Sequence, residues 1–226
     1  MTVLKNKKYI FFDFDGTLVD SAACILSSYE FVMQTFDMKP KVKIEQGIIG
    51  PPLPETMKML VGDVSEKTLS EMTHCFKERY DAIVEKETLS YSGIEAVLNQ
   101  LKACHKKLFV ATNKRTEPTF SVINELNWNS LFESIQCVDM LPTEHQSKTK
   151  LLSNMLHEYE VEPSQAVYIG DRTDDQIAAL SNQVDFVAVA WGYGDWSGYD
   201  GVCLSQVNAL TSLLEDDLAG SRESEF

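Results

Sequence analysis

The chain has 226 residues, of which 44% are hydrophobic and 24% are charged, a composition typical of globular proteins and unlike that of disordered, collagen-like or repeat proteins. Its 20 basic and 34 acidic residues give a net charge of −14, which disfavours nucleic acid and anionic membranes as partners. The sequence contains no apolar run of about 18 residues and no signal-peptide core, so we expect a cytoplasmic protein without a membrane segment.

The cysteines are odd in number, widely spaced and free of any CxxC pair. They are Cys24, Cys75, Cys104, Cys137 and Cys203. This pattern argues against a disulfide framework and against a structural zinc site. We expect most of them to be buried as small apolar side chains.

Short apolar runs with the character of buried strands alternate with segments of helical periodicity. The strand-like runs are 9–12, 108–111, 166–169 and 186–189. Apolar residues recur at helical spacing in segments 94–101, 120–126 and 151–156. This alternation predicts an α/β protein with a doubly wound parallel sheet that helices cover on both faces.

Strand-like runs are missing from residues 21–87. Apolar residues recur there at helical spacing from Ile25 to Phe36 and from Leu69 to Ile83. Residues 47–54 between them are rich in glycine and proline, which break regular structure. We therefore expect an all-helical insert whose two helical arms are joined by an irregular segment.

Polar residues follow three of the predicted strands, at the carboxyl ends where open α/β sheets bind their ligands. They are Asp13 and Asp15 after the first strand, Thr112 and Asn113 after the second, and Asp171, Asp174 and Asp175 after the third. Lys148 lies at a predicted helix N-terminus, where the helix dipole disfavours a cation unless an anion binds beside it. A single aspartate after a strand is more often a turn former or helix cap.

Together these carboxylates would form a cluster of like charge, which is costly unless a divalent cation occupies it. Mg²⁺ suits the set, because it binds oxygen ligands and substrate phosphates through one or two protein carboxylates. A calcium-binding EF-hand is excluded, since the glutamate it requires is replaced by Cys24 for a loop starting at Asp13 and by Asn182 for one starting at Asp171. The sequence also contains neither a P-loop nor a GxGxxG dinucleotide motif.

Four motifs, FFDFDGTLVDS, ATNK, SKTKLL and YIGDRTDD, occur in this order, each at a predicted strand end or helix start. In order and spacing they resemble the haloacid dehalogenase-like phosphohydrolase superfamily, over nearly the whole chain. YIGDRTDD and the later AWGYG are most similar to its phosphoglycolate phosphatase group. The resemblance implies a Rossmann-like catalytic core from residues 1–20 and 88–226, and a helical cap domain from residues 21–87.

Carried onto the matching residues, the resemblance implies that Asp13 is the nucleophile and forms an aspartyl-phosphate. Asp15 would be the general acid and base, Thr112 would hydrogen-bond the phosphoryl oxygens, and Lys148 would neutralise charge. Such a carboxylate nucleophile divides one difficult displacement into two easier steps.

The resemblance also implies the metal and substrate contacts. Mg²⁺ would bind Asp13, the main-chain carbonyl of Asp15, and Asp171, with Asp175 orienting Lys148 or the metal-bound waters. The predicted substrate contacts are Gly16, Thr112, Asn113 and Lys148.

For two of these roles, a second residue nearby in the sequence is an alternative. Lys148 is preferred over Lys150 because the spacing SKxxLL fits the family, although Thr149 replaces the usual proline. Asp175 is preferred over Asp174 because the spacing is GDxxxD.

Other polar and aromatic residues are less informative. Lys114 and Arg115 could reach substrate, but an exposed helix start is the favoured interpretation. Trp191, Tyr193 and Trp196 could equally line the site or pack in the core. Surface positions are expected for His74, His105, His145 and His157, which lack ligand spacing.

The predicted function is a Mg²⁺-dependent hydrolase of phosphomonoesters that acts on a small phosphorylated metabolite, similar to phosphoglycolate phosphatases. A dehalogenase is disfavoured, because a halide leaving group needs no proton from an acid at Asp15. A sugar phosphate mutase, a pyrophosphatase of the same superfamily and a catalytically weak phospho-ligand-binding protein remain alternatives. We expect specificity to depend on residues 47–56. Exposed apolar residues on the cap could support a homodimer, and the acidic residues 215–226 are expected to form a solvated tail.

Overall fold

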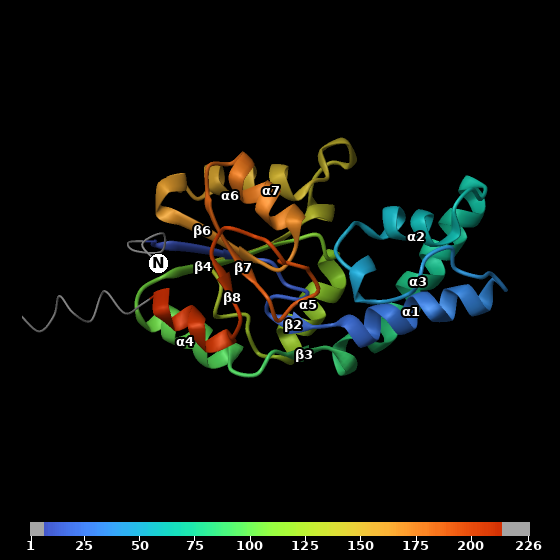
Figure 1. The fold of residues 1–226 in the computed structure, drawn as a ribbon, viewed down its shortest axis with the longest axis horizontal. Coiled ribbons are helices and arrows are strands. Elements are labelled where there is room, and N and C mark those ends of the chain that lie inside the picture. The colour runs from blue at the N-terminus through green and yellow to red at the C-terminus, as the bar shows by residue number, and fades with distance from the viewer. Residues whose placement is uncertain (1–6, 214–226) are drawn as a thin grey trace, which may run out of the picture.

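The computed structural model describes residues 7–213, and a six-stranded parallel sheet lies at its centre (Figure 1). The strands lie in the order β5-β4-β1-β6-β7-β8. Their bounds are β1 Tyr9–Phe12, β4 Lys107–Thr112, β5 Ser134–Cys137, β6 Ala166–Gly170, β7 Asp185–Val189 and β8 Cys203–Leu204. From β1 the chain adds β4 and β5 on one side and then β6 to β8 on the other. The strand order therefore reverses at β1, where sheets of this type form their ligand crevice.

The register of the central strands brings the predicted polar residues to one edge of the sheet. Phe12, the last residue of β1, pairs with Val110 of β4 and with Ile169 of β6. Because the three strands are parallel, the residues after each pairing emerge at the same edge. Asp13 and Asp171 thus leave the sheet side by side, although they are far apart in the sequence.

Helices cover both faces of the sheet, as predicted from the alternation of apolar runs. One face carries α4 (Ile94–Ala103) and α5 (Thr116–Glu125), and the other carries α6 (Lys148–Glu158) and α7 (Thr173–Ser181) (Figure 1). Successive residues of a strand point to opposite faces, so Phe12 packs in the core on the α4 side while Phe11 packs in the core on the α6 side. The doubly wound α/β sheet is confirmed.

Between β2 (Val19–Asp20) and β3 (Leu89–Ser90), the regular structure is helical, which confirms the expected helical insert (Figure 1). The insert contains α1 (Ala22–Thr35), η2 (Gln46–Ile48), α2 (Leu53–Val61) and α3 (Glu66–Glu87). β2 and β3 pair in antiparallel fashion, so the two chain crossings into the insert lie side by side. The predicted irregular segment 47–54 is partly wrong, because Leu53 and Pro54 form the first turn of α2. Proline is tolerated there, since the first-turn N–H groups have no intrahelical partner.

Six of the α-helices and β-strands were not predicted: β2, β3, β5, β8, α2 and α7. β5 is an edge strand of mixed polarity and β8 has only two residues. The remaining short helices are η3 (Val138–Met140), η4 (Thr143–His145), η5 (Pro163–Gln165) and η6 (Val207–Leu213). None of the helices in residues 7–213 combines the length and apolar character that crossing a membrane requires.

The cysteines depart from the expectation of burial. Cys24 and Cys137 are buried, Cys75 and Cys104 are half-buried, and Cys203 is exposed, all as free thiols. The expectation that most would be buried is therefore wrong, because Cys75 lies at a half-exposed position in the middle of α3, Cys104 at the C-terminal end of α4 and Cys203 in the short edge strand β8. The acidic tail at 215–226 lies outside the described residues.

Candidate active site

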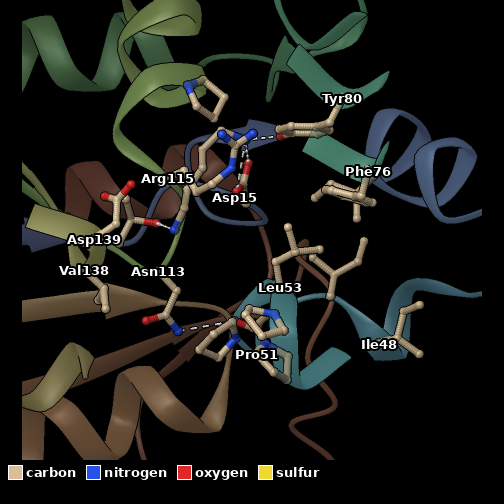
Figure 2. Close-up of a pocket in the computed structure, with 18 of the residues that line it drawn as sticks. Asp15, Ile48, Pro51, Leu53, Phe76, Tyr80, Asn113, Arg115, Val138 and Asp139 are labelled. Atoms are coloured by element: carbon tan, nitrogen blue, oxygen red, sulfur yellow. Dashed lines mark hydrogen bonds and ion pairs between the residues drawn. The ribbon is translucent and has the colours of Figure 1, made fainter. Parts of the chain in front are cut away.

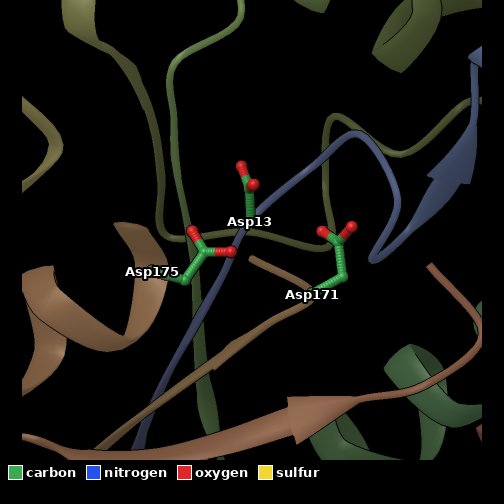
Figure 3. Close-up of side chains that lie close together, drawn as sticks. All are labelled: Asp13, Asp171 and Asp175. Carbon is green, nitrogen blue, oxygen red and sulfur yellow. The ribbon is translucent and has the colours of Figure 1, made fainter. Parts of the chain in front are cut away.

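Three buried carboxylates converge at the carboxyl edge of the sheet: Asp13, Asp171 and Asp175 (Figure 3). One oxygen from each lies within 4.8 Å of the others. Asp13 follows β1, Asp171 follows β6, and Asp175 lies in the first turn of α7. The carboxyl side chain of Asp15, by contrast, is not part of this group.

Backbone and hydroxyl donors fix the orientation of each carboxylate. Asp13 Oδ1 accepts a hydrogen bond from the amide of Phe14 at 2.7 Å. Asp171 accepts from the hydroxyl of Thr17 at 3.1 Å and from the amide of Tyr193 at 2.8 Å. Asp175 accepts from the amide of Arg172 at 2.9 Å, as a helix-capping carboxylate does. After these hydrogen bonds, each carboxylate still has lone pairs available for a further ligand.

Lys148 enters this cluster from the N-terminus of α6. Its Nζ lies 2.9 Å from Asp13 Oδ2, 2.5 Å from Asp175 Oδ1 and 3.2 Å from Asp174 Oδ2. Lys148 is 5% exposed, whereas Lys150 lies at the surface. Lys148, and not Lys150, is therefore the lysine that contacts the carboxylates. Asp175 lies inside the cluster, with the half-buried Asp174 at its rim.

The charges in this cluster do not balance. Burial raises the pKa of Asp13 and Asp175, and burial together with the neighbouring Asp13 raises the pKa of Asp171 from 3.8 to about 7. Burial alone would lower the pKa of Lys148, but Asp13, Asp174 and Asp175 raise it well above its ordinary value. A single lysine thus faces more negative charge than it can neutralise. Three converging carboxylates with excess negative charge are a donor set that fits Mg²⁺.

Glycine is required where the turn after β1 passes Asp171. Gly16 has φ of +82°, and a Cβ at this position would lie 2.3 Å from Asp171 Oδ2. Gly192, in the loop after β7, approaches the same turn, because its Cβ would lie 2.3 Å from the carbonyl oxygen of Gly16. Gly16 lies against the carboxylate of Asp171 and does not line the cavity described below, so its predicted contact with substrate stays a prediction.

Asp15 is held by a second network, on the side of the helical insert. Both of its carboxylate oxygens accept from Lys114 Nζ, at 2.9 and 3.1 Å, and the Ser21 hydroxyl donates to Oδ1 at 2.6 Å. Lys114 Nζ also contacts the hydroxyl of Tyr80 on α3. Ser21 of the insert thus contacts the predicted acid directly, and Tyr80 reaches it only through Lys114.

The interpretation of Lys114 as part of an exposed helix start is wrong. Its side chain is buried, with the residue 8% exposed, because α5 begins only at Thr116 and the chain before it turns toward Asp15. The sequence did hold a signal, since Lys114 follows Thr112 and Asn113 in the same polar stretch at the end of β4. Arg115 is half-buried and pairs with Asp81 of α3.

Thr112 and Asn113 lie at the carboxyl end of β4, at the same edge of the sheet. Thr112 is buried, and its hydroxyl accepts from the amide of Lys114 at 3.2 Å. Asn113 donates to Asp174 at 2.8 Å and to the carbonyl of Gly50 at 3.2 Å. Asn113 thus links the core to the loop of the insert.

A cavity of about 340 Å³ opens between the sheet edge and the insert (Figure 2). Asp13, Asp15 and Thr112 line its inner end. Residues 48–54 of the insert line it as well, within the 47–56 segment that we expected to govern specificity. None of the four histidines is among its lining residues.

Of the three aromatic residues Trp191, Tyr193 and Trp196, some line the site and others pack within the protein. Tyr193 lines the cavity. Trp196 instead packs against Phe186, with ring centroids 5.5 Å apart, and Trp191 donates to the carbonyl of Thr17 at 3.1 Å. One of the three is therefore a wall of the site, and two are packing residues.

Residues 10–189 match the family model described as haloacid dehalogenase-like hydrolase. A phosphoglycolate phosphatase of Psychrobacter arcticus is 24% identical over 202 residues, which cover 83% of this chain and 85% of that protein. The tyrosine-protein kinase PtkA of Mycobacterium tuberculosis is 28% identical over 192 residues, but these cover 84% of this chain and only 64% of that protein.

Solved structures extend the similarity to the fold. A crystal structure described as a "predicted phosphatase" from Clostridium acetobutylicum superposes with a TM-score of 0.80 at 26% identity, over 92% of this chain and 99% of that chain. The family model covers most of the chain and includes both strand ends that carry the acidic cluster. The chain belongs to the haloacid dehalogenase-like hydrolase family.

Proposed function

We propose that this protein is a Mg²⁺-dependent phosphomonoester hydrolase that transfers the phosphoryl group of a small metabolite to Asp13 and then to water. The position of Asp13 carries the proposal: its carboxylate lies at the inner end of the cavity, bonded to Lys148 and beside Asp171 and Asp175. Similarity to proteins named as phosphatases supports the same activity.

The reaction follows from the roles of the side chains. A carboxylate oxygen of Asp13 attacks phosphorus, the bond from phosphorus to the ester oxygen breaks, and Asp15 donates a proton to the leaving oxygen. A water then attacks the aspartyl-phosphate, Asp15 takes up its proton, and inorganic phosphate departs with Asp13 restored. Throughout, Lys148 and the hydroxyl of Thr112 stabilise the negative charge on the phosphoryl oxygens.

Asp13, Asp171 and the main-chain carbonyl of Asp15, with Asp175 adjacent, would hold Mg²⁺. The bound ion would supply positive charge that offsets the charge of the phosphoryl group facing an anionic nucleophile. The chain's own residues keep the nucleophile aligned meanwhile. Asp13 is held by Phe14 and Lys148, and Asp175 holds Lys148 in place.

We further propose that residues 21–87 act as a mobile cap over a core of residues 1–20 and 88–226. The paired strands β2 and β3 form the two connections, and the cavity lies between insert and core. Opening would admit substrate, and closure would bring Ser21 and Tyr80 to the Asp15 network and exclude bulk water. A homodimer stays a prediction.

The test is release of inorganic phosphate from p-nitrophenyl phosphate, with Mg²⁺ and with a chelator. The wild-type protein should release phosphate only when Mg²⁺ is present, and Asp13→Asn should abolish release while circular dichroism shows an unchanged fold. Asp63→Asn, at an exposed position of the insert, is the matched control and should retain full activity. More than a few per cent of activity in Asp13→Asn would remove Asp13 from the nucleophile role.

A further inference from the structure

The cavity beside Asp13 has two ends of different chemistry. Its inner end is polar and holds Asp13, Asp15 and Thr112, which act on the phosphoryl ester in the proposed function. Its outer part is largely apolar, with aromatic, aliphatic and proline side chains from three segments of the insert. The apolar lining residues of the insert are Ile25 and Tyr29 from α1, Ile48, Ile49, Pro51, Pro52, Leu53 and Pro54 from the connecting segment and the start of α2, and Phe76 and Tyr80 from α3.

Aromatic rings form one wall of this outer part. Phe76 stacks with Tyr80, with ring centroids 5.5 Å apart, and its ring lies 4.4 Å from that of Tyr29. In Figure 2, Phe76 and Tyr80 lie across the view from Val138, while Pro51 and Leu53 lie between them. Such surfaces bind apolar and ring-shaped groups, and they offer few partners to a charged group.

The cations that line the cavity are mostly engaged within the protein. Lys114 is neutralised by both oxygens of Asp15, and Arg115 is paired with Asp81. Arg172 donates to the carbonyls of Tyr193 and Gly47, at 3.2 Å each. Among the described residues, Lys77 is the lining cation that lacks both a carboxylate and a carbonyl partner, and it is half-buried on α3.

Negative charge at the outer part further disfavours an anion there. Asp139 lines the cavity opposite α3 and is exposed, with its oxygens directed to the amide and hydroxyl of Thr116. A carboxylate on the substrate would meet this aspartate while losing its own hydration, an unfavourable combination. A two-carbon acid would also leave most of the apolar wall without a partner.

We propose that the cavity recognises phosphomonoesters whose leaving group is an uncharged apolar ring or a body of similar size, and that it discriminates against leaving groups bearing a carboxylate or a second phosphate. This inference rests on the proposed phosphatase function for its substrate. It concerns the outer cavity alone, and it assigns specificity to Leu53, Phe76 and the proline segment of the insert.

The test uses three esters of primary alcohols, so that intrinsic reactivity is similar: benzyl phosphate, ethyl phosphate and phosphoglycolate. With Mg²⁺ present, kcat/KM for benzyl phosphate should exceed that for phosphoglycolate at least tenfold, with ethyl phosphate between them. Calorimetric titration with benzylphosphonate and phosphonoacetate, which are not hydrolysed, should show the same preference in binding.

Leu53→Lys places a positive charge in the apolar wall of the cavity. Leu53 is half-buried at the first turn of α2, so the lysine can be accommodated without a cavity in the core. The ratio of kcat/KM for benzyl phosphate to that for phosphoglycolate should fall at least tenfold, through KM. Met59→Lys, on the same helix and outside the cavity lining, is the control and should leave the ratio unchanged.

Preference of the wild-type protein for phosphoglycolate, lost in Lys77→Gln, would make the cavity an anion site and overturn the inference. A ratio that Leu53→Lys does not alter would overturn it too. Binding of benzylphosphonate without turnover of any ester would support the cavity assignment but overturn the phosphatase proposal. Failure to bind either phosphonate and to cleave any ester would overturn both.

Discussion

Lys148 shows how a single residue can serve both the fold and the proposed chemistry. It is the buried cation that contacts Asp13 and Asp175, and both its burial and its partners are set by the start of α6, which Ser147 caps. Removing one partner of a buried ion pair leaves the other charges uncompensated. In the proposed mechanism the same lysine would contact the phosphoryl oxygens.

We predict that Lys148→Ala lowers kcat by about 10²–10³-fold, the scale of losing a major group that stabilises transition-state charge. Steady-state kinetics with Mg²⁺ at saturating substrate measures the effect. Lys150→Ala, at an exposed position two residues away, should remain within about twofold of wild type, as surface changes usually do. A Lys148→Ala protein within tenfold of the wild-type kcat would contradict the assignment.

Lys114 is a positioning residue in this scheme, because it acts through Asp15. Lys114→Met should lower kcat at least tenfold with little change in KM, since Asp15 loses the two bonds that orient its carboxylate. Tyr80→Phe removes only the hydroxyl that contacts Lys114 and should cause a smaller loss of kcat. Equal effects on kcat and KM in Lys114→Met would instead indicate a direct contact with substrate.

At the scale of elements, the four strands that were predicted are those whose own sequences are continuous apolar runs. β5 escaped prediction because Ser134 and Gln136 make it half polar, and its place at the edge comes from pairing with β4. α2 was missed because Pro54 suggested a loop, although proline is tolerated in a first turn. Tertiary pairing and helix-end chemistry, which periodicity does not report, decided both elements.

The convergence of Asp13 and Asp171 could be predicted from the sequence, because both residues come directly after strands whose register is simple. Asp13 and Asp171 meet through the pairing of β1 with β6 alone. The partners of Asp15 could not be predicted in this way. Ser21 and Lys114 contact Asp15 directly, and Tyr80 of the insert contacts Lys114. The contact with Tyr80 depends on how the insert packs on the core.

Gly16, in the turn after β1, has a backbone conformation and a close approach to Asp171 that a larger residue would disturb. Gly16→Ala introduces a side chain at φ of +82° and 2.3 Å from Asp171 Oδ2, so the turn or the carboxylate must move. We expect a loss of about 1–3 kcal/mol in the free energy of unfolding, measured with urea, and a weaker response to Mg²⁺. Gly47→Ala, where a Cβ would meet nothing within 4 Å, is the control. Unchanged stability in Gly16→Ala would show that the close approach is not maintained in solution.

Across the molecule as a whole, the favourable packing of the core offsets the cost of burying Asp13, Asp171 and Asp175, which destabilise the fold when no cation is bound. The sheet, α6 and α7 provide the hydrophobic core that holds three carboxylates away from water. The raised pKa values of Asp13, Asp171 and Asp175 are the measure of that destabilisation, because each unit of pKa shift corresponds to about 1.4 kcal/mol between the two protonation states. A bound divalent cation would convert the same cluster into a source of stability.

The pH dependence of stability follows from the direction of these shifts. A carboxyl whose pKa is raised in the folded state binds protons more tightly there than in the unfolded chain. Its favourable contribution is therefore present at low pH and lost as pH rises through the folded-state pKa. For Asp171 this window runs from 3.8 to about 7. Without a divalent cation, the wild-type protein should lose stability across this window relative to a variant that lacks the charge.

Asp171→Asn is that variant, and its amide can replace the carboxylate with little strain, because its oxygen can accept from the amide of Tyr193 and its NH₂ can donate to the hydroxyl of Thr17. In a chelator, Tm of Asp171→Asn minus Tm of wild type should increase from pH 4 to pH 7 and be positive at pH 8. Millimolar Mg²⁺ at pH 8 should raise the Tm of the wild-type protein and of Asp63→Asn but not that of Asp171→Asn. A difference in Tm that is independent of pH would show that Asp171 is not a destabilising buried charge. Equal stabilisation of all three proteins by Mg²⁺ would show that it is not a ligand. The group that makes the proposed chemistry possible would then have to be sought elsewhere in the acidic cluster.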